Sequence, residues 1–323
     1  MGKLEPKELK AVINCLKRSR GAVIPPRVGF DSGVHRIRGD LCLVASTDPC
    51  LGVPKDWLGW LLIHYAASNV AIFGVKPRYC TLNLLGPPET STGLFKAVMR
   101  EACEAASELD IQIVAGHTGR YGGLNDLVGV CTAYGFASLS HVISPGDVRP
   151  GDSILCTKPI GLETLVTFAH VRRNLAKKLF GVSLAAQLSR QFRIQSCVRD
   201  ALALSKVSGV HAMHDAAEGG LVAALNEMAE ASNVGFSLDL ESFKIPAEIQ
   251  TLVRHFQLSV EELVSMSSTG TIVAALDRGS ERRVLRRLAA LEVPASVVGT
   301  FSRSRRRIFK GHFGERPFPS KPR

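Results

Sequence analysis

The sequence predicts a mixed α/β protein with two domains, and three observations lead to this fold class. The chain has 323 residues, which is more than one hydrophobic core of ordinary size requires. Short apolar runs alternate with segments of helical periodicity along most of the chain. A stretch dense in turn-forming residues, Ser144–Asp152, separates two such halves and is the best candidate for a domain boundary.

The first half alternates between predicted helices and predicted strands. A helix is expected where apolar residues recur with helical spacing, and a strand where a short apolar run is bounded by turn formers. In chain order, the elements expected are a helix at Leu9–Arg18, a strand at Leu41–Ser46, a helix at Lys55–Phe73 between Pro54 and Gly74, a strand at Tyr79–Leu85, a helix at Thr92–Leu109, and strands at Ile111–Ala115 and Asp126–Gly135.

The second half repeats this alternation with a longer helical stretch near its start. The elements expected are a strand at Ser153–Thr157, helices up to about Val207, a strand that ends before His214, a helix from Leu221, and strands at Val234–Leu240, Thr271–Leu276 and Ser296–Phe301. Neither half contains a short-period repeat or a low-complexity tract.

Composition narrows the class of protein. Hydrophobic residues make up 46% and charged residues 21% of the chain, which is the balance of a soluble globular protein. No apolar run reaches the roughly 18 residues that span a bilayer. The first residues lack the apolar segment of a signal peptide, so we expect a cytoplasmic protein. None of the eight cysteines forms a C-x-x-C pair, which predicts buried thiols rather than a zinc ribbon or a redox dithiol.

The basic charge is concentrated near the C-terminus. Residues 301–323 hold eight basic residues and one acid, so this segment carries +7 of the net charge of +11. Its charge and its prolines predict a solvated, flexible tail over residues 303–323. The alternative is a docking segment for nucleic acid or an acidic partner, but no RNA-binding or helix-turn-helix pattern accompanies it.

A histidine, an acid and two glycines stand together before the helix that follows Leu221. Two glycines at the start of a helix allow the backbone to approach an anion closely, and the free N–H groups of the first turn can bind it. The preceding His214 and Asp215 add titratable groups beside Gly219 and Gly220. The alternative is that the glycines form only a tight turn.

Polar residues recur near the ends of elements in the first half. Asp31 lies in a glycine-flanked loop, Asp48 follows the strand Leu41–Ser46, and Asn69 lies near the end of the helix Lys55–Phe73. The segment Gly116–Gly119 follows the strand Ile111–Ala115. Oxygen ligands of this kind suit Mg²⁺ held jointly with phosphate oxygens, whereas each residue alone could equally be a cap or a turn residue.

In this order, the motifs resemble a superfamily with four well-known members. These are aminoimidazole ribonucleotide (AIR) synthetase, selenophosphate synthetase, thiamine-monophosphate kinase and the hydrogenase-maturation carbamoyl dehydratase. The similarity runs from about Gly29 to Thr300, and the stretch from His214 to Leu221, followed by Asn226–Ala229, looks most like the hydrogenase-maturation branch and its archaeal-type relatives.

The resemblance implies an architecture and a set of site residues. It implies an N-terminal helical extension (1–28), an ATP-binding domain (29–146) whose sheet pairs with its copy in a homodimer, a C-terminal domain (147–302) that closes over the ATP, and the tail. Asp31 and Asp48 match metal-binding acids, and Asn69 stands where relatives usually have an aspartate. The residues matching the phosphate loop are Gly116, His117 and Thr118.

Departures from the family pattern leave the activity open. Ser32, Asn69 and Gly119 occupy positions where acids are common, so we expect weaker metal binding. The last cysteine is Cys197, so we expect none of the C-terminal thiol chemistry of the carbamoyl dehydratase. The preferred interpretation is an ATP- and Mg²⁺-dependent enzyme that phosphorylates an amide, acyl or phosphate-bearing small molecule, with His214 and Asp215 on the acceptor side. Two alternatives remain, namely a non-catalytic nucleotide- or partner-binding homologue and a kinase like the thiamine-monophosphate branch.

Overall fold

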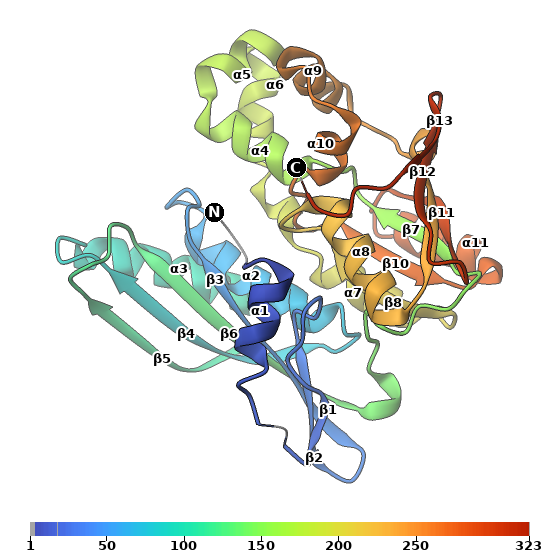
Figure 1. Ribbon diagram of the computed structural model, residues 1–323. Helices are drawn as coiled ribbons and strands as arrows, with labels where there is room; N and C mark the ends of the chain where they lie inside the picture. The colour runs from blue at the N-terminus through green and yellow to red at the C-terminus, as the bar shows by residue number, and fades with distance from the viewer. Residues whose placement is uncertain (1–3, 18, 323) are drawn as a thin grey trace. The chain divides into compact units, whose positions relative to one another are not determined.

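The computed structural model describes residues 4–17 and 19–322 and divides into two compact units. The first unit holds residues 6–142, and the second holds residues 143–322 together with residues 4–5. Each unit is built on one β-sheet with helices packed against it, so the predicted mixed α/β fold class is confirmed (Figure 1). Among the described residues, no helix combines the length and the apolar character needed to cross a membrane.

The first unit contains a six-stranded sheet with the strand order β1-β2-β3-β6-β4-β5. Its elements are α1 (Pro6–Ile13), β1 (Ala22–Ile24), β2 (Gly33–Arg38), β3 (Leu41–Cys50), α2 (Leu58–Ala71), β4 (Pro77–Gly86), α3 (Thr92–Glu108), β5 (Gln112–Arg120), β6 (Val128–Ser138) and the 3₁₀ turn η1 (Leu139–His141). Arg18, the last residue of the helix predicted at Leu9–Arg18, lies outside the described residues.

Alternation of side chains explains how the sheet and its helices pack. In β4, Cys80, Leu82 and Leu84 are buried, whereas Tyr79 and Asn83 are exposed. Such a pattern is typical of a sheet with one covered face. Helix α2 is buried almost all round and lies against β3, β6 and α3, so it forms the centre of this unit's core.

Strand β3 is longer than predicted, which corrects the expected position of Asp48. The strand continues through Asp48 and Pro49 to Cys50, and Asp48 pairs with Cys131 of β6. Strand β2 pairs with β3 only up to Ala45, so on that side the following residues have no partner strand among the described residues. A proline is tolerated there because its missing N–H would have had no partner strand.

Strand β5 corrects a second expectation. Residues 116–119 do not form a loop after the strand but belong to it, and they pair in parallel with residues 82–85 of β4. A Cβ on Gly116 would lie 2.6 Å from the carbonyl oxygen of Leu82. The glycine therefore permits a close strand contact rather than a loop conformation.

The second unit contains a seven-stranded sheet with the strand order β13-β12-β9-β11-β7-β10-β8. Its strands are β7 (Ser153–Thr157), β8 (Val210–Asp215), β9 (Gly235–Asp239), β10 (Ile272–Leu276), β11 (Ala295–Ser302), β12 (Arg307–Gly311) and β13 (Gly314–Pro317). The central strands β7 and β10 are buried along their whole length, as expected for strands covered on both faces.

Helices of this unit surround the sheet. They are α4 (Leu162–Val171), α5 (Arg173–Phe180), α6 (Val182–Leu188), α7 (Val198–Leu204), α8 (Gly220–Ser232), α9 (Ala247–Phe256), α10 (Val260–Ser265) and α11 (Glu281–Ala289), with 3₁₀ turns η2 (Phe192–Gln195), η3 (Leu240–Ser242) and η4 (Arg278–Ser280). Helices α4, α5, α6 and α9 contact one another away from the sheet (Figure 1).

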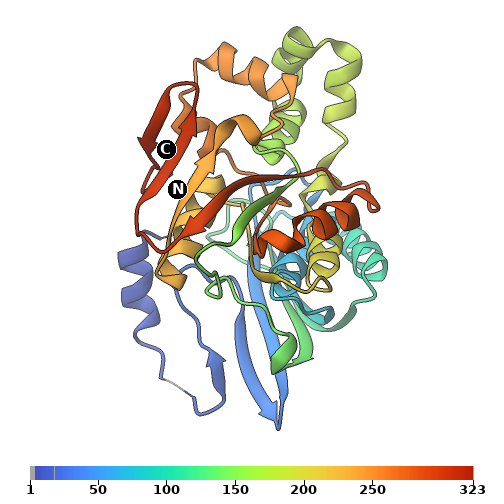
Figure 2. The same ribbon diagram turned by 90° about the vertical axis from the view of Figure 1, so that its right-hand side faces the viewer.

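The basic C-terminal segment is folded, so the prediction of a flexible tail is wrong over its described part. Strand β12 pairs in parallel with β9 and antiparallel with β13, and the two C-terminal strands lie side by side in Figure 2. Phe309 and Phe318 are buried and pack on Phe236 or on each other. These aromatic residues add to the core, while the arginines that suggested a solvated tail point mostly to solvent.

Candidate functional site

In the first unit, the loop before β2, strand β3 and the end of α2 meet at a polar cluster. We call Asp31, Asp48 and Asn69 the acid cluster. The amide Nδ2 of Asn69 donates a hydrogen bond of 3.1 Å to Oδ2 of Asp48. The hydroxyl of Ser46 donates to the carbonyl oxygen of Asp31 at 2.6 Å, and the hydroxyl of Ser32 donates to the carbonyl oxygen of Asn69 at 2.8 Å. Three separate elements are therefore tied together by short polar contacts.

The acid cluster has the chemistry of a hard-cation site. Two carboxylates and one amide supply only oxygen ligands, which is the donor set that Mg²⁺ and Ca²⁺ prefer. Asp31 and Asp48 are half-buried, and Asn69 is buried. Since Asn69 donates its amide N–H to Asp48, the pair is stable even without a cation between the two side chains.

The structure does not place Gly116, His117 and Thr118 beside the acid cluster. The register aligns Asp48 with Cys131, Leu82 and Gly116 in one row across β3, β6, β4 and β5. Three strand spacings separate the ends of that row, which is roughly 14 Å. The three residues are exposed on the edge strand and line a cavity of about 290 Å³. His117 also bonds to the hydroxyl of Tyr121 at 2.5 Å.

In the second unit, three loops gather at one end of the sheet. They are residues 158–161 after β7, residues 216–219 after β8 and residues 266–271 before β10, and we call them the loop end. Ser268 joins them, because its hydroxyl accepts from the N–H of Gly161 at 2.7 Å and its own N–H donates to Ala216 at 3.0 Å. The N–H of Ala216 donates in turn to the carbonyl oxygen of Thr271 at 2.8 Å.

His214 and Asp215 are the last two residues of β8, and His214 is buried. Its Nδ1 lies 2.8 Å from the carbonyl oxygen of Asp215, and its Nε2 lies 2.9 Å from a carboxylate oxygen of Glu227 on α8. Both ring nitrogens of His214 therefore lie close to oxygen atoms, one of the backbone and one of a carboxylate. Glu227 lies two turns inside the helix, and the sequence indicated it only as part of the stretch Asn226–Ala229 that resembles the hydrogenase-maturation branch.

Gly219 and Gly220 precede and begin helix α8, as the sequence suggested. Both have positive φ, of 83° and 58°. A Cβ on Gly220 would lie 2.4 Å from the carbonyl oxygen of Met266, so this glycine permits the close contact between two loops of the loop end. The positive end of the helix dipole makes the N-terminal turn of α8 favourable for a negative charge.

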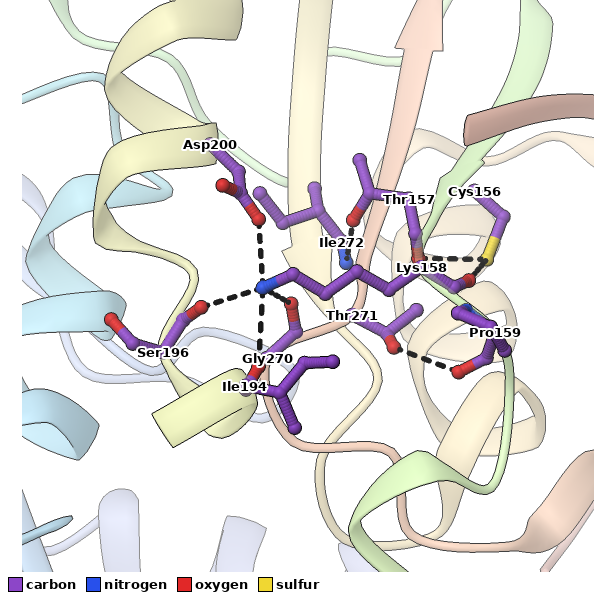
Figure 3. A network of polar contacts seen from close by, with 10 residues as sticks. All are labelled: Cys156, Thr157, Lys158, Pro159, Ile194, Ser196, Asp200, Gly270, Thr271 and Ile272. Atoms are coloured by element: carbon purple, nitrogen blue, oxygen red, sulfur yellow. Dashed lines mark hydrogen bonds and ion pairs between the residues drawn. The ribbon is translucent and has the colours of Figure 1, made fainter. Parts of the chain in front are cut away.

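Lys158, the first residue of the loop after β7, binds several segments at the loop end. The sequence had not suggested this residue. Its Nζ lies 2.8 Å from Oδ2 of Asp200 and donates to the carbonyl oxygens of Ile194, Ser196 and Gly270 at 3.2, 2.6 and 2.9 Å (Figure 3). The side chains of Lys158 and Asp200 are only 9% and 5% exposed. Burial raises the pKa of Asp200, and the Lys158 ammonium partly offsets that increase.

A half-buried acid, Glu163, binds the loop that precedes β10. Its Oε2 accepts from the N–H and the hydroxyl of Thr269 at 3.1 and 2.6 Å and from the hydroxyl of Ser267. Glu163 also lies in the first turn of α4, where a negative charge is favourable. The loop end is therefore held by ion pairs and hydrogen bonds from several elements. The only indication of Glu163 in the sequence is its place as an acid in the first turn of a helix.

Solved structures share this fold. The hydrogenase maturation protein HypE of E. coli superposes with a TM-score of 0.74 at 22% identity, covering 87% of both chains. A structure of HypE in complex with ATP has a TM-score of 0.72 at 21% identity, covering 90% of this chain and 87% of that one. At this level of identity the likeness shows the fold.

Curated proteins show the same relationship in sequence. A protein described as a hydrogenase expression/formation protein of Methanocaldococcus jannaschii is 24% identical over 242 residues, covering 72% of this chain and 66% of the relative. The selenide, water dikinase of Myxococcus xanthus is 22% identical over 329 residues, covering 92% and 90% of the two chains.

Family models match both halves of the chain. The N-terminal domain of the AIR synthase related proteins matches residues 29–137, and their C-terminal domain matches residues 149–310. These matches cover most of both units. The resemblance predicted from the motifs is confirmed, and the chain belongs to the AIR synthase related protein family.

Proposed function

We propose that the protein is an ATP- and Mg²⁺-dependent enzyme that transfers the γ-phosphoryl group to an oxygen of a small molecule. The acceptor would be an amide, an acyl group or a phosphate-bearing compound. The observation that carries this proposal is the acid cluster, in which the amide of Asn69 bonds to the carboxylate of Asp48 and two serine hydroxyls hold the Asp31 loop against β3 and the end of α2. A family relative solved in complex with ATP supports the nucleotide.

The residues of the acid cluster fit the needs of a bound triphosphate. Asp31, Asp48 and the side-chain oxygen of Asn69 would hold Mg²⁺, which neutralises phosphate charge during transfer. Backbone N–H groups at the edge strand β5, near Gly116 and Thr118, would bind the more distant part of the nucleotide. The distance of roughly 14 Å between them suits an extended nucleotide rather than a single phosphate.

Acceptor binding is assigned to the loop end of the second unit. The first turn of α8 after Gly219 and Gly220 offers backbone N–H donors to an anionic acceptor. Asp215 would orient the acceptor's reacting group as a general base or a hydrogen-bond acceptor. His214, held between Asp215 and Glu227, would position Asp215 rather than react itself.

A second copy of the chain is the partner proposed for the first unit. Strands β3, β4 and β6 bury alternate residues under α2 and α3, whereas Tyr79 and Phe136 on the other face are 43% and 41% exposed and pack edge to face. Exposed aromatic residues on a bare sheet face are typical of an interface. The result expected from light scattering is a dimer that Phe136→Asp converts to a monomer. A dimer that survives this change would contradict the proposed face.

A non-catalytic nucleotide-binding protein is the second candidate, and one contact favours it. The neutral amide of Asn69 donates a hydrogen bond to the carboxylate of Asp48. This pair contains only one negative charge, so it does not require a cation. A protein that binds nucleotide without turnover has no need for tight metal binding. The enzyme should release ADP and the binding protein should not, although both should bind nucleotide.

The experiment that tests the proposal joins a binding assay to a product assay. Thermal unfolding is measured with ATP and Mg²⁺, with ATP and a chelator, and with neither. ADP release is then measured with amide, carboxylate and phosphate-bearing acceptors. Stabilisation that requires Mg²⁺, together with ADP release that requires one acceptor class, supports the enzyme. Stabilisation without ADP release from any acceptor supports the second candidate, and no stabilisation contradicts both.

A further inference from the structure

A cluster of ionisable side chains lies at the end of the seven-stranded sheet opposite the loop end. Asp152 directly precedes β7, His211 is the second residue of β8, and Asp277 directly follows β10. Since β10 is antiparallel to both β7 and β8, these positions share one end of the sheet. Strands of five or six residues separate them from the loop end by roughly 16 Å or more.

Asp152 fixes the orientation of the His211 ring. Nδ1 of His211 lies 3.0 Å from both carboxylate oxygens of Asp152, and Oδ2 of Asp152 also accepts from the N–H of Arg149 at 2.8 Å. The two side chains are only 8% and 4% exposed. A carboxylate at Nδ1 favours the tautomer with its proton there, which leaves the lone pair of the ring on Nε2.

The other ring nitrogen faces a second carboxylate at a distance too long for a hydrogen bond. Nε2 of His211 lies 3.6 Å from Oδ2 of Asp277, and Nε2 has no hydrogen-bond partner among residues 4–17 and 19–322. Two electron-pair donors that face each other are held more stably by a cation between them. Two ligands bound to one tetrahedral ion at about 2.0–2.2 Å lie roughly 3.3–3.6 Å apart, which matches this separation.

Local backbone features bring these two groups together. The pairing of β8 with β10 shifts its register at His211, and such a bulge redirects a side chain. The N–H of Asp277 donates to the carbonyl oxygen of Gly209 at 2.8 Å. Gly209 has φ of 96°, and a Cβ there would lie 2.9 Å from Oδ2 of Asp277 and closer still to the hydroxyl of Ser280. Any other residue would therefore occupy the space beside the carboxylate.

We propose that His211 and Asp277 bind a divalent transition-metal ion, with Asp152 as the acceptor that orients the histidine. An imidazole nitrogen with a carboxylate oxygen suits Zn²⁺ better than Mg²⁺, which prefers oxygen ligands. Asp277 is 58% exposed, so water completes the coordination. The ion joins the start of β8 to the turn after β10. This site is independent of the nucleotide chemistry proposed for the acid cluster.

The test is a calorimetric titration of ZnCl₂ into the chelator-treated full-length chain at neutral pH. The wild type is compared with Asp277→Asn, which removes an exposed carboxylate and so leaves the fold intact, and with His211→Gln. The control is His312→Gln, which removes an exposed histidine of the same unit. We expect both site variants to lose one equivalent of bound zinc and the control to keep it. Asp152→Asn should weaken zinc binding about 10- to 100-fold.

Two outcomes overturn the proposal. Asp277→Asn that binds zinc with the stoichiometry and affinity of the wild type would show that the zinc is held elsewhere. No zinc uptake by the wild type, together with nitrogen NMR showing protons on both ring nitrogens of His211, would make His211 an imidazolium paired with two carboxylates. Nucleotide binding is measured on the same samples, so a failed metal site is distinguished from a failed proposed function.

Discussion

The acid cluster of the first unit and the loop end of the second unit are both rich in polar contacts, but they differ in burial and charge balance. At the loop end, the ammonium of Lys158 is almost fully buried and is surrounded by one carboxylate and three carbonyl oxygens. In the acid cluster, Asp31 and Asp48 are half-buried, and the carboxylate of Asp48 accepts a hydrogen bond from the amide of Asn69. The Lys158 network is therefore mainly a scaffold, whereas the acid cluster can still gain from a ligand.

The largest effect is expected from Lys158→Met, which removes one partner of a buried ion pair. The loss of an ion-pair partner in the interior costs about 3–5 kcal/mol of the free energy of unfolding, because the remaining charge is uncompensated. Chemical denaturation measures this cost. The double variant Lys158→Met/Asp200→Leu should recover much of it. Equal instability of the single and double variants would contradict the scaffold interpretation.

The same variant predicts a pH dependence with a definite sign. Burial already raises the pKa of Asp200, and removal of Lys158 removes the main opposing influence. A carboxyl group whose pKa is raised on folding contributes stability at low pH and loses it as the pH rises. We expect the free energy of unfolding of Lys158→Met to fall, relative to wild type, as the pH increases above about 4. A relative stability that does not change between acidic and neutral pH would contradict this assignment.

The Lys158 network also shows where sequence reasoning stops. Periodicity predicted helices α2 and α3 and most strands, because each depends on neighbouring residues. Lys158 and Asp200 are 42 positions apart, and nothing in either segment indicates the pairing. The sequence also led us to expect Asp48 after the end of a strand and Gly116 in a loop. Their actual roles depend on which strand edge is free and which strand passes close by.

The acid cluster was partly accessible from the sequence for a different reason. The family motifs named Asp31, Asp48 and Asn69, and in the structure Asn69 bonds to Asp48 while two serine hydroxyls tie the Asp31 loop to the elements that carry them. The motifs could not show that Asn69 donates to Asp48, nor that Gly116 lies three strands from Asp48. The buried phenylalanines of the C-terminal segment were likewise hidden by its arginines, because net charge does not report which face of a strand is covered.

An intermediate effect is expected at the contact between His214 and Glu227. Glu227→Gln keeps the shape of the side chain but removes the charge 2.9 Å from Nε2 of His214, and should cost about 1–2 kcal/mol of the free energy of unfolding. Glu230→Gln on the same helix is the matched control. Its side chain is 83% exposed and pairs with Arg307, so its loss should change stability very little. Equal effects of the two changes would show that the His214 contact is not part of the scaffold.

A smaller loss of stability, which Mg²⁺ should reverse, is expected on substitution of Asn69. Asn69→Asp replaces a hydrogen bond to Asp48 by a contact between like charges, which should cost about 1 kcal/mol without a metal. Mg²⁺ should then restore the melting temperature of the variant, and should bind it more tightly than the wild type. Asn69→Gln, which keeps the amide but changes its reach, is the control. A variant that does not respond to Mg²⁺ would show that the acid cluster is not a cation site.

The most direct test of the central claim is a titration of ATP with Mg²⁺ into the wild type and into Asp48→Asn, with unfolding measured in parallel. If the acid cluster is a ligand site, the free energy of unfolding of the variant should lie within about 0.5 kcal/mol of the wild-type value, as is usual for a substitution outside the core. Its affinity for ATP with Mg²⁺ should be at least about tenfold lower, a difference of about 1.4 kcal/mol in binding free energy. A variant that binds ATP with Mg²⁺ as tightly as the wild type, or that loses stability instead of affinity, would contradict the account.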